Sequence, residues 1–326
     1  MVDVHTFLAH CTRRFGTGNP TRIDNAFWHH MVRTGERAID ARNEFEPERG
    51  PRVDDPVWCF NRFGPSRTPL PDGTIVCIGG EHEDYYDPDF CIYNDVIVIG
   101  SGGRLSIFGY PREVFPPIDF HTADLCGDRI IIVGGLGYVE DRGGPTPVFS
   151  LDLANYSISR LNPTGPSPGW IYKHKSQLLD SGRVLRIHGG SRIEEGPAQK
   201  SVANTRAVDL LLTEMIWKPA PAPAPEEPSD IPLPYPWKAI SRNRERSYLI
   251  DELRQQVPIG HPLFAVNVDP VAEDDSGKLL FRLRDGSGRF ACVELELMEE
   301  RHAALPKPLT KFYESIEEFI GAEESR

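Results

Sequence analysis

The side chains with the widest chemical use gather between residues 79 and 96, in the stretch GGEHEDYYDPDFCIYNDV. Carboxylate oxygens are ligands suited to Ca²⁺ or Mg²⁺, and a histidine nitrogen among them would favour Mn²⁺ or Zn²⁺. The stretch lacks the ligand order of an EF-hand loop. One hypothesis is therefore a divalent-cation site, formed by Glu81, His82, Glu83, Asp87 and Asp89. We consider no other cofactor.

Sequence motifs for phosphate-binding loops and zinc proteases are absent. There is no G-x-x-x-x-G-K-[ST] and no H-E-x-x-H. The glycine-rich runs GSGG (100–103) and GGLGY (134–138) lie between expected strands, without the following helix that would bind a phosphate group. We therefore expect a non-enzymatic protein. The alternative is a metal-dependent hydrolase with its cation at the Glu81–Asp89 loop.

A repeat defines the elements that must position this loop. Pairs of glycines recur 55 residues apart, at 79–80, 134–135 and 189–190. Each pair follows a turn and an apolar run (TIVCI, RIIIV, RVLRIH), and a polar loop and two more apolar runs come after it. The runs predict strands that are covered on both faces. Each unit therefore predicts four short antiparallel strands, which must stack on neighbouring units to bury both faces.

These repeats resemble the kelch family. The resemblance is carried by the diglycine, by the asparagine 14 residues after it in two units (Asn94 and Asn204), and by Trp217, which closes the third unit. Phe149 and Phe108 depart from the pattern. The resemblance covers about residues 58–218 and implies a β-propeller. The block 55–190, with FGYPREVFPPIDFH, also looks like an uncharacterised bacterial kelch-like family, which implies no activity.

Three units are fewer than the four to eight blades of closed propellers. The flanks could supply a further sheet, two chains could combine as a dimer, or the array could stay open and be capped. We expect a mainly β protein with N-terminal helices, kelch-like propeller repeats and a small C-terminal α+β domain. The expected boundaries are 1–50 for the helical segment, 51–218 for the repeats, 219–237 for a Pro-rich linker and 238–326 for the α+β domain.

The flanks show further local patterns. Residues 22–45 predict helix, with Asp24 or Asn25 as the cap, a break at Gly35, and an apolar stripe formed by Phe27, Trp28, Met31 and Val32. Residues 244–257 predict an amphipathic helix, 261–268 a strand, 277–298 a hairpin around Asp285-Gly286, and 309–322 a closing helix. This last layout resembles a small α+β domain of uncharacterised bacterial proteins. A DNA-reading helix pair and a Pro-rich SH3 or WW ligand are alternatives that we do not favour.

The net charge of −12 repels phosphate backbones, so we expect no nucleic-acid partner and favour a protein with a basic surface. The six cysteines form no C-x-x-C pair and are read as reduced thiols of a cytoplasmic protein. The first residues lack the apolar core of a signal peptide, and no apolar run reaches the ~18 residues of a membrane span.

Propeller geometry would bring the loops 81–92, 136–147 and 191–204 to one end, together with cations at Arg67, Arg112, Lys173 and Lys175. The acids there could pair internally, attract a basic partner or bind a metal. We expect a protein–protein interaction or scaffold protein, or alternatively an immunity protein against a basic toxin. Its expected contacts are Glu81, Glu83, Asp84, Asp87, Glu140, Asp141, Glu194 and Glu195. His121, His174 and His188 are expected to be structural, the first two by bonding neighbouring units.

Overall fold

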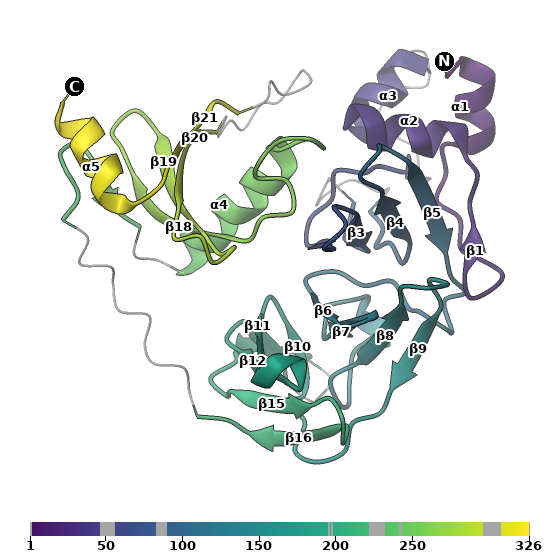
Figure 1. The fold of residues 1–326 in the computed structure, drawn as a ribbon. Helices are drawn as coiled ribbons and strands as arrows, with labels where there is room; N and C mark the ends of the chain where they lie inside the picture. Colours follow the sequence, from purple (N-terminus) through teal and green to yellow (C-terminus); the bar gives the residue numbers. More distant parts are fainter. Residues whose placement is uncertain are drawn as a thin grey trace. The chain divides into compact units, whose positions relative to one another are not determined.

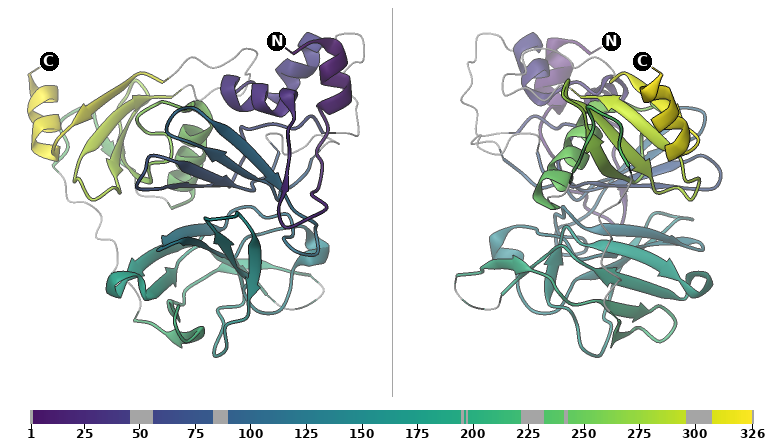
Figure 2. Two further views of the ribbon diagram at one scale, coloured as in Figure 1. Left: turned by 45° about the vertical axis from the view of Figure 1, so that its right-hand side comes forward. Right: turned by 90° about the vertical axis from the view of Figure 1, so that its left-hand side faces the viewer.

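The computed structural model describes residues 2–45, 56–82, 90–194, 196, 198–221, 232–240, 243–295 and 308–325. These residues form five antiparallel sheets of three to five strands and five α-helices, which confirms the expected mainly β class (Figures 1 and 2). The chain divides into two compact units, one of Met1–Val32 with Glu36–Pro223 and one of Arg33–Gly35 with Ala224–Arg326. Within the described ranges, no helix is both long and apolar enough to cross a membrane.

The N-terminal helices lie next to the first sheet (Figures 1 and 2). They are α1 (Val4–His10), α2 (Ala26–Thr34) and α3 (Ala38–Phe45). Asn25 caps α2, because its Oδ1 accepts a hydrogen bond from the Trp28 N–H at 3.0 Å, and Gly35 separates α2 from α3 with a φ of 65°. The predicted cap, break and buried stripe are therefore confirmed. The start at residue 22 is wrong, because Thr21–Arg22 pairs as a strand with the first sheet.

Each of the three predicted repeats forms four antiparallel strands that pair in chain order. The first sheet contains β2 (Ser66–Pro69), β3 (Ile75–Ile78), β4 (Val96–Ile99) and β5 (Leu105–Gly109), with β1 (Thr21–Arg22) added beside β5. The second contains β6 (Thr122–Cys126), β7 (Arg129–Val133), β8 (Val148–Asp152) and β9 (Ile158–Leu161). The third contains β11 (Lys175–Leu179), β12 (Val184–His188), β15 (Val208–Leu211) and β16 (Ile216–Pro219). A small sheet of β10 (Trp170–Tyr172), β13 (Ser191–Ile193) and β14 (Ser201–Ala203) accompanies the third.

The second sheet is buried on both faces, which explains its continuous apolar strand RIIIV. Ile130 and Ile132 pack against the first sheet, whereas Ile131 and Val133 pack against the third, and all four side chains are fully buried. Successive strand residues point to opposite faces, so both neighbours demand an apolar side chain. The three sheets therefore stack through two separate apolar cores.

Each diglycine follows the second strand of its sheet, and the first two lie against the connection that leads into the next sheet. A Cβ on Gly79 would come within 2.2 Å of the Ile118 carbonyl oxygen, and one on Gly134 within 2.6 Å of the Ile171 carbonyl oxygen. Ile118 and Ile171 belong to the connections that lead into the following sheet. Glycine is required because the backbone φ is positive and this connection leaves no room for a side chain. Gly189 has the same backbone conformation, but a Cβ there would meet no described atom within 4 Å.

The face of the third sheet that points away from the second carries a polar row, Gln177, Arg186, Asp209 and Lys218, beside a partly buried apolar row, Leu179, Val184, Leu211 and Ile216. Arg186 on β12 forms an ion pair with Asp209 on β15 at 2.8 Å, and the two residues are direct cross-strand partners. The neighbouring Leu185 points the other way, into the apolar core. Polar residues on an outer face are typical of the terminal unit of a stack.

The other compact unit, which contains Ala224–Arg326, has a five-stranded antiparallel sheet in chain order. Its strands are β17 (Lys238–Ala239), β18 (Val268–Glu273), β19 (Lys278–Leu283), β20 (Phe290–Glu294) and β21 (Thr310–Tyr313). Helix α4 (Asn243–Gln256) packs into one apolar core with the sheet through Leu249 and Leu253. Helix α5 (Ile316–Glu324) packs into another through Phe319. The predicted helix at 244–257 and the hairpin are confirmed.

Two boundary predictions in this unit are wrong. The expected strand at 261–268 is a turn region, in which the Phe264 N–H bonds the His261 carbonyl, and the strand begins at Val268. The expected helix at 309–322 starts late, because its first part is β21 and Ser315 caps α5. In both places a short apolar run fits either element, and pairing with the adjacent strand decides between them.

Candidate functional site

The loops that follow the diglycines meet at one end of the stack, which we call the loop end. The Tyr138 hydroxyl from the second unit accepts a hydrogen bond from the Ile92 N–H of the first unit at 2.8 Å. The Gln199 side chain of the third unit donates to the Val139 carbonyl of the second at 3.1 Å. The described parts of the three loops are therefore in direct contact, as the repeat predicts.

The acids of the second loop are paired within the protein. Glu140 and Asp141 belong to a 3₁₀ turn, η1 (Val139–Asp141). The Arg112 guanidinium, from the connection after β5, lies 3.2 Å from Glu140 Oε1 and 2.7 Å from Asp141 Oδ2. The Glu140 side chain is still 66% exposed. Arg112 is one of the cations expected at this end. Its positive charge offsets part of the negative charge on Glu140 and Asp141 that would attract a basic partner.

The acids of the other two loops are only partly described. Glu194 follows β13 and lies 3.3 Å from the Arg192 guanidinium. Glu83, Asp84, Asp87, Asp89 and Glu195 lie outside the described residues. Their expected roles in partner or metal binding therefore stay predictions.

Glu81 and His82 lie in the interior beneath the first loop, with 5% and 1% exposure. Glu81 pairs through its backbone with Phe63 and Ile92, and His82 Nε2 lies 3.1 Å from the Val57 carbonyl oxygen. Neither side chain is at the surface. Among the residues that the structure describes, no three His, Cys, Asp or Glu side chains come together as metal ligands, so nothing observed favours the hydrolase alternative.

A buried carboxyl, Asp119, lies beneath the loop end. Its Oδ1 accepts a hydrogen bond from the Gly137 N–H at 2.7 Å, which links the connection before β6 to the second loop. Burial raises the pKa of Asp119, whereas hydrogen bonds with Gly137 and the Glu81 side chain act to lower it. The carboxyl thus orders the loop from below.

The two central histidines join neighbouring sheets, as expected. His121 Nε2 lies 2.9 Å from the Ser66 hydroxyl of the first sheet, and His174 Nε2 lies 3.1 Å from the Thr122 hydroxyl of the second. Burial and the nearby His188 lower the pKa of His174 to about 3. The imidazole is therefore uncharged at neutral pH and acts as a structural bridge rather than as a base.

A buried ion pair supports the first loop, and sequence reasoning did not find it. Both Arg62 terminal nitrogens contact the Asp95 carboxylate, at 2.5 and 3.1 Å, and the Trp58 indole N–H donates to Asp95 at 2.7 Å. The guanidinium also lies over the Tyr93 ring, 3.5 Å from its centroid. The only signal in the sequence was an acid placed directly before an apolar strand.

Residues 165–169 match the pattern G-x-S-x-G, which marks the nucleophile of many hydrolases. The Ser167 hydroxyl oxygen accepts hydrogen bonds from the Thr146 and Gly169 N–H groups. The segment leads into strand β10, not into a helix, and no histidine bonds Ser167 among the described residues. The match is therefore a loop-ordering serine and not a nucleophile elbow.

An aromatic and arginine patch, which we call the loop-end patch, was also not predicted. It consists of Arg13, Phe15, Phe90, Tyr138 and Val139. Arg13 donates to the Ile92 carbonyl at 2.6 Å and to the Tyr138 hydroxyl at 3.1 Å, and it lies over the Phe15 ring. Val139 and Phe90 are 59% and 38% exposed. Phe90 and Val139 are therefore accessible, and the hydrogen bonds of Arg13 hold the residues beneath them in place.

Comparison with known proteins identifies no family. No family model matches the chain, and no curated protein matches it. Among solved structures, one titled "Structure of YjhT" shares 12% sequence identity over 51% of this chain, with a TM-score of 0.32. The match spans about half of that protein, 53% of its chain. At this TM-score the similarity carries no conclusion about fold or function.

Proposed function

We propose that residues 56–221 form an open, kelch-like array of three propeller-type sheets and that the protein is a non-enzymatic binding protein. Three observations support the array. Each unit has the same four-stranded order. The first two diglycines leave room for the connection that leads into the next sheet, and the outer face of the third sheet carries the Arg186–Asp209 ion pair. In this proposal the helices cap one side of the array and the Arg186–Asp209 face ends the other.

The loop-end patch is the observation that carries the function. Protein interfaces concentrate their binding energy in a few buried aromatic and arginine residues. The patch offers such residues on loops that a rigid scaffold positions. Three chain segments hold it in place, since Arg13 and Ile92 both bond Tyr138. Phe90 packs edge-on against Tyr138, with the ring centroids 6.5 Å apart.

The partner in this proposal is a protein that covers Phe90 and Val139 with an apolar segment. In this proposal the acidic residues predicted from the sequence contribute less to partner binding than the apolar side chains do. Glu140 lies at the edge of the patch with Arg112 beside it, so this pair orients a partner more than it attracts a basic one. Glu81 lies inside the protein and makes no contact with the partner.

Capture from cell lysate with the full chain tests the proposal when it includes a matched control. Val139→Asp places a charge in the patch, whereas Leu178→Ser changes an exposed apolar residue outside the patch, on β11 (36%). We expect one protein to be recovered in stoichiometric amount with the wild type and with Leu178→Ser, and to be lost at least about tenfold with Val139→Asp. Titration of that purified partner against the same three proteins must reproduce the order. Equal recovery with all three would exclude the loop-end patch.

A further inference from the structure

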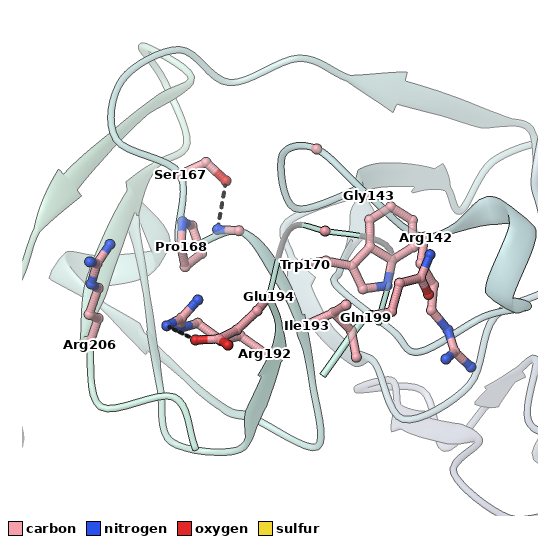
Figure 3. Close-up of a pocket in the computed structure, with 13 residues that line it drawn as sticks. Arg142, Gly143, Ser167, Pro168, Trp170, Arg192, Ile193, Glu194, Gln199 and Arg206 are labelled. Atoms are coloured by element: carbon pink, nitrogen blue, oxygen red, sulfur yellow. Dashed lines mark hydrogen bonds and ion pairs between the residues drawn. The ribbon is translucent and has the colours of Figure 1, made fainter. Parts of the chain in front are cut away.

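The second and third repeats together line a pocket of about 550 Å³ that the proposed protein docking does not use. Its walls come from the second loop (142–144), the segment 167–170, residues 192–194 at the end of β13, and the single residues Gly196, Gln199 and Arg206 (Figure 3). Sites for small molecules typically enclose about 300–1,000 Å³. The pocket lies at the loop end, since Gln199 lines it and bonds the Val139 carbonyl.

The pocket is basic in an acidic protein. Three arginines line it, Arg142, Arg192 and Arg206, and Glu194 is the one acid among its described lining residues. The chain as a whole carries a net charge of −12. Cations gathered in a concave site raise the local concentration of anions there. The charge of the pocket is thus opposite to that of the chain.

Two of the arginines can turn donors toward a ligand. Among the described residues, the Arg192 guanidinium has one long contact, at 3.3 Å, with Glu194. Arg206 is exposed, and its guanidinium makes no ion pair or hydrogen bond within the part of the chain that the structure describes. Figure 3 draws both on one side of the pocket, near Pro168. Guanidinium groups bind carboxylate and phosphate through paired hydrogen bonds.

The third arginine belongs to the wall. Arg142 donates to the Leu136 carbonyl at 3.2 Å and to the Gly137 carbonyl at 2.9 Å. Beside it, the Trp170 indole N–H donates to the same Leu136 carbonyl at 3.1 Å, which holds the ring in one orientation. Trp170 is only partly buried and lines the pocket next to Ile193. A flat apolar surface therefore lies across the pocket from the available arginines.

We propose that this pocket binds a small molecule that carries a carboxylate or phosphate group and a planar apolar part. Arg192 and Arg206 bind the anionic group, and Trp170 stacks against the apolar part. Glu194 holds Arg192 in the empty pocket and releases it to a stronger bidentate contact. The site is separate from the loop-end patch, because neither Phe90 nor Val139 lines it.

Calorimetric titration of the full chain tests the site with four probes: inorganic phosphate, phenyl phosphate, benzoate and uncharged benzamide. We expect saturable one-to-one binding of phenyl phosphate and benzoate, weaker binding of inorganic phosphate and none of benzamide. Combined Arg192→Gln and Arg206→Gln substitutions should weaken the two aromatic anions by about ten- to a hundredfold. Arg183→Gln, an exposed arginine outside the pocket, should change nothing.

The aromatic wall is tested by Trp170→Leu, checked for folding by its urea unfolding curve. This variant should lose the preference for phenyl phosphate over inorganic phosphate while inorganic phosphate binds as before. The proposal is overturned if no anionic probe shows saturable binding up to about 10 mM. Equal losses in Arg183→Gln would overturn it too, because they would show a general charge effect. None of these results bears on the partner-capture experiment, which uses other residues.

Discussion

Replacement of Asp124 by asparagine should stabilise the protein at neutral pH and leave it unchanged in acid. Asp124 lies on β6, the first strand of the second sheet, and bonds Ser176 on β11, the first strand of the third sheet. Its Oδ2 is buried with no hydrogen-bond partner among the described residues. Burial raises the pKa of Asp124 to about 6, and the bond to Ser176 opposes only part of this effect.

The size and sign of the effect follow from the two pKa values. The pKa of Asp124 rises from 3.8 to about 6 on folding, which at 1.36 kcal/mol per unit amounts to about 3 kcal/mol. The folded state holds the proton more tightly than the unfolded state. The contribution of Asp124 to the unfolding free energy is therefore fully present below pH 4 and is lost as the pH rises through about 6. Asparagine, which does not ionise, avoids this loss.

Urea unfolding at pH 4, 5, 6 and 7, followed by tryptophan fluorescence, measures the effect. The advantage of Asp124→Asn should be near zero at pH 4 and approach about 3 kcal/mol at pH 7. Asp72→Asn is a control of opposite sign, because the hydrogen bond from Thr74 lowers the pKa of this exposed turn residue. Replacement of the Asp72 carboxylate should destabilise the protein at pH values above the pKa that Asp72 has in the unfolded chain. A constant advantage of Asp124→Asn at every pH would refute the reasoning, since it would show a packing effect.

Two further predictions concern backbone clearance and buried charge. Gly189→Ala should lower the unfolding free energy by about 1–2 kcal/mol, because an alanine there must adopt a left-handed backbone conformation. Gly134→Ala should lower it by about 1–3 kcal/mol more, because its Cβ would also overlap the Ile171 carbonyl oxygen. Asp95→Asn should cost about 3–5 kcal/mol, because it leaves the Arg62 guanidinium buried without its counter-charge. The unfolding free energy from urea denaturation measures each.

Each of these predictions has an outcome that contradicts it. Equal costs at Gly134 and Gly189 would mean that the connection between sheets moves freely aside. For the buried pair, Asp209→Asn is the matched control, because its partner Arg186 is more exposed and should leave a loss below about 1 kcal/mol. If Asp95→Asn cost no more than this control, the Arg62 cluster would not support the first loop.

Local patterns identified much of the fold. The fixed spacing of the diglycines predicted the three four-stranded units, and the stripe from Phe27 to Val32 predicted the buried face of α2. Such signals are readable because each depends on residues close in the chain. The predictions were wrong at residues 261–268 and 309–313. The apolar runs there are short, and pairing with a neighbouring strand decides their conformation.

The candidate sites were far less predictable. The acids drew attention because charged residues in a loop are visible in a sequence, yet Glu140 and Asp141 are matched by Arg112 from 28 and 29 residues away. The contact between Arg13 and Tyr138 spans 125 residues. No periodic pattern joins positions so far apart.

The sequence by itself determined the repeat, the β class and the positions where only glycine can stand, because backbone conformation and strand burial depend on residue type and short-range order. Tertiary structure alone decided which charges face solvent and which neutralise one another. The reason is physical: the strength of an electrostatic contact depends on distance and on exposure to water, and both arise only when the loops of different units meet. The arginine pocket and the loop-end patch exist only at that meeting point.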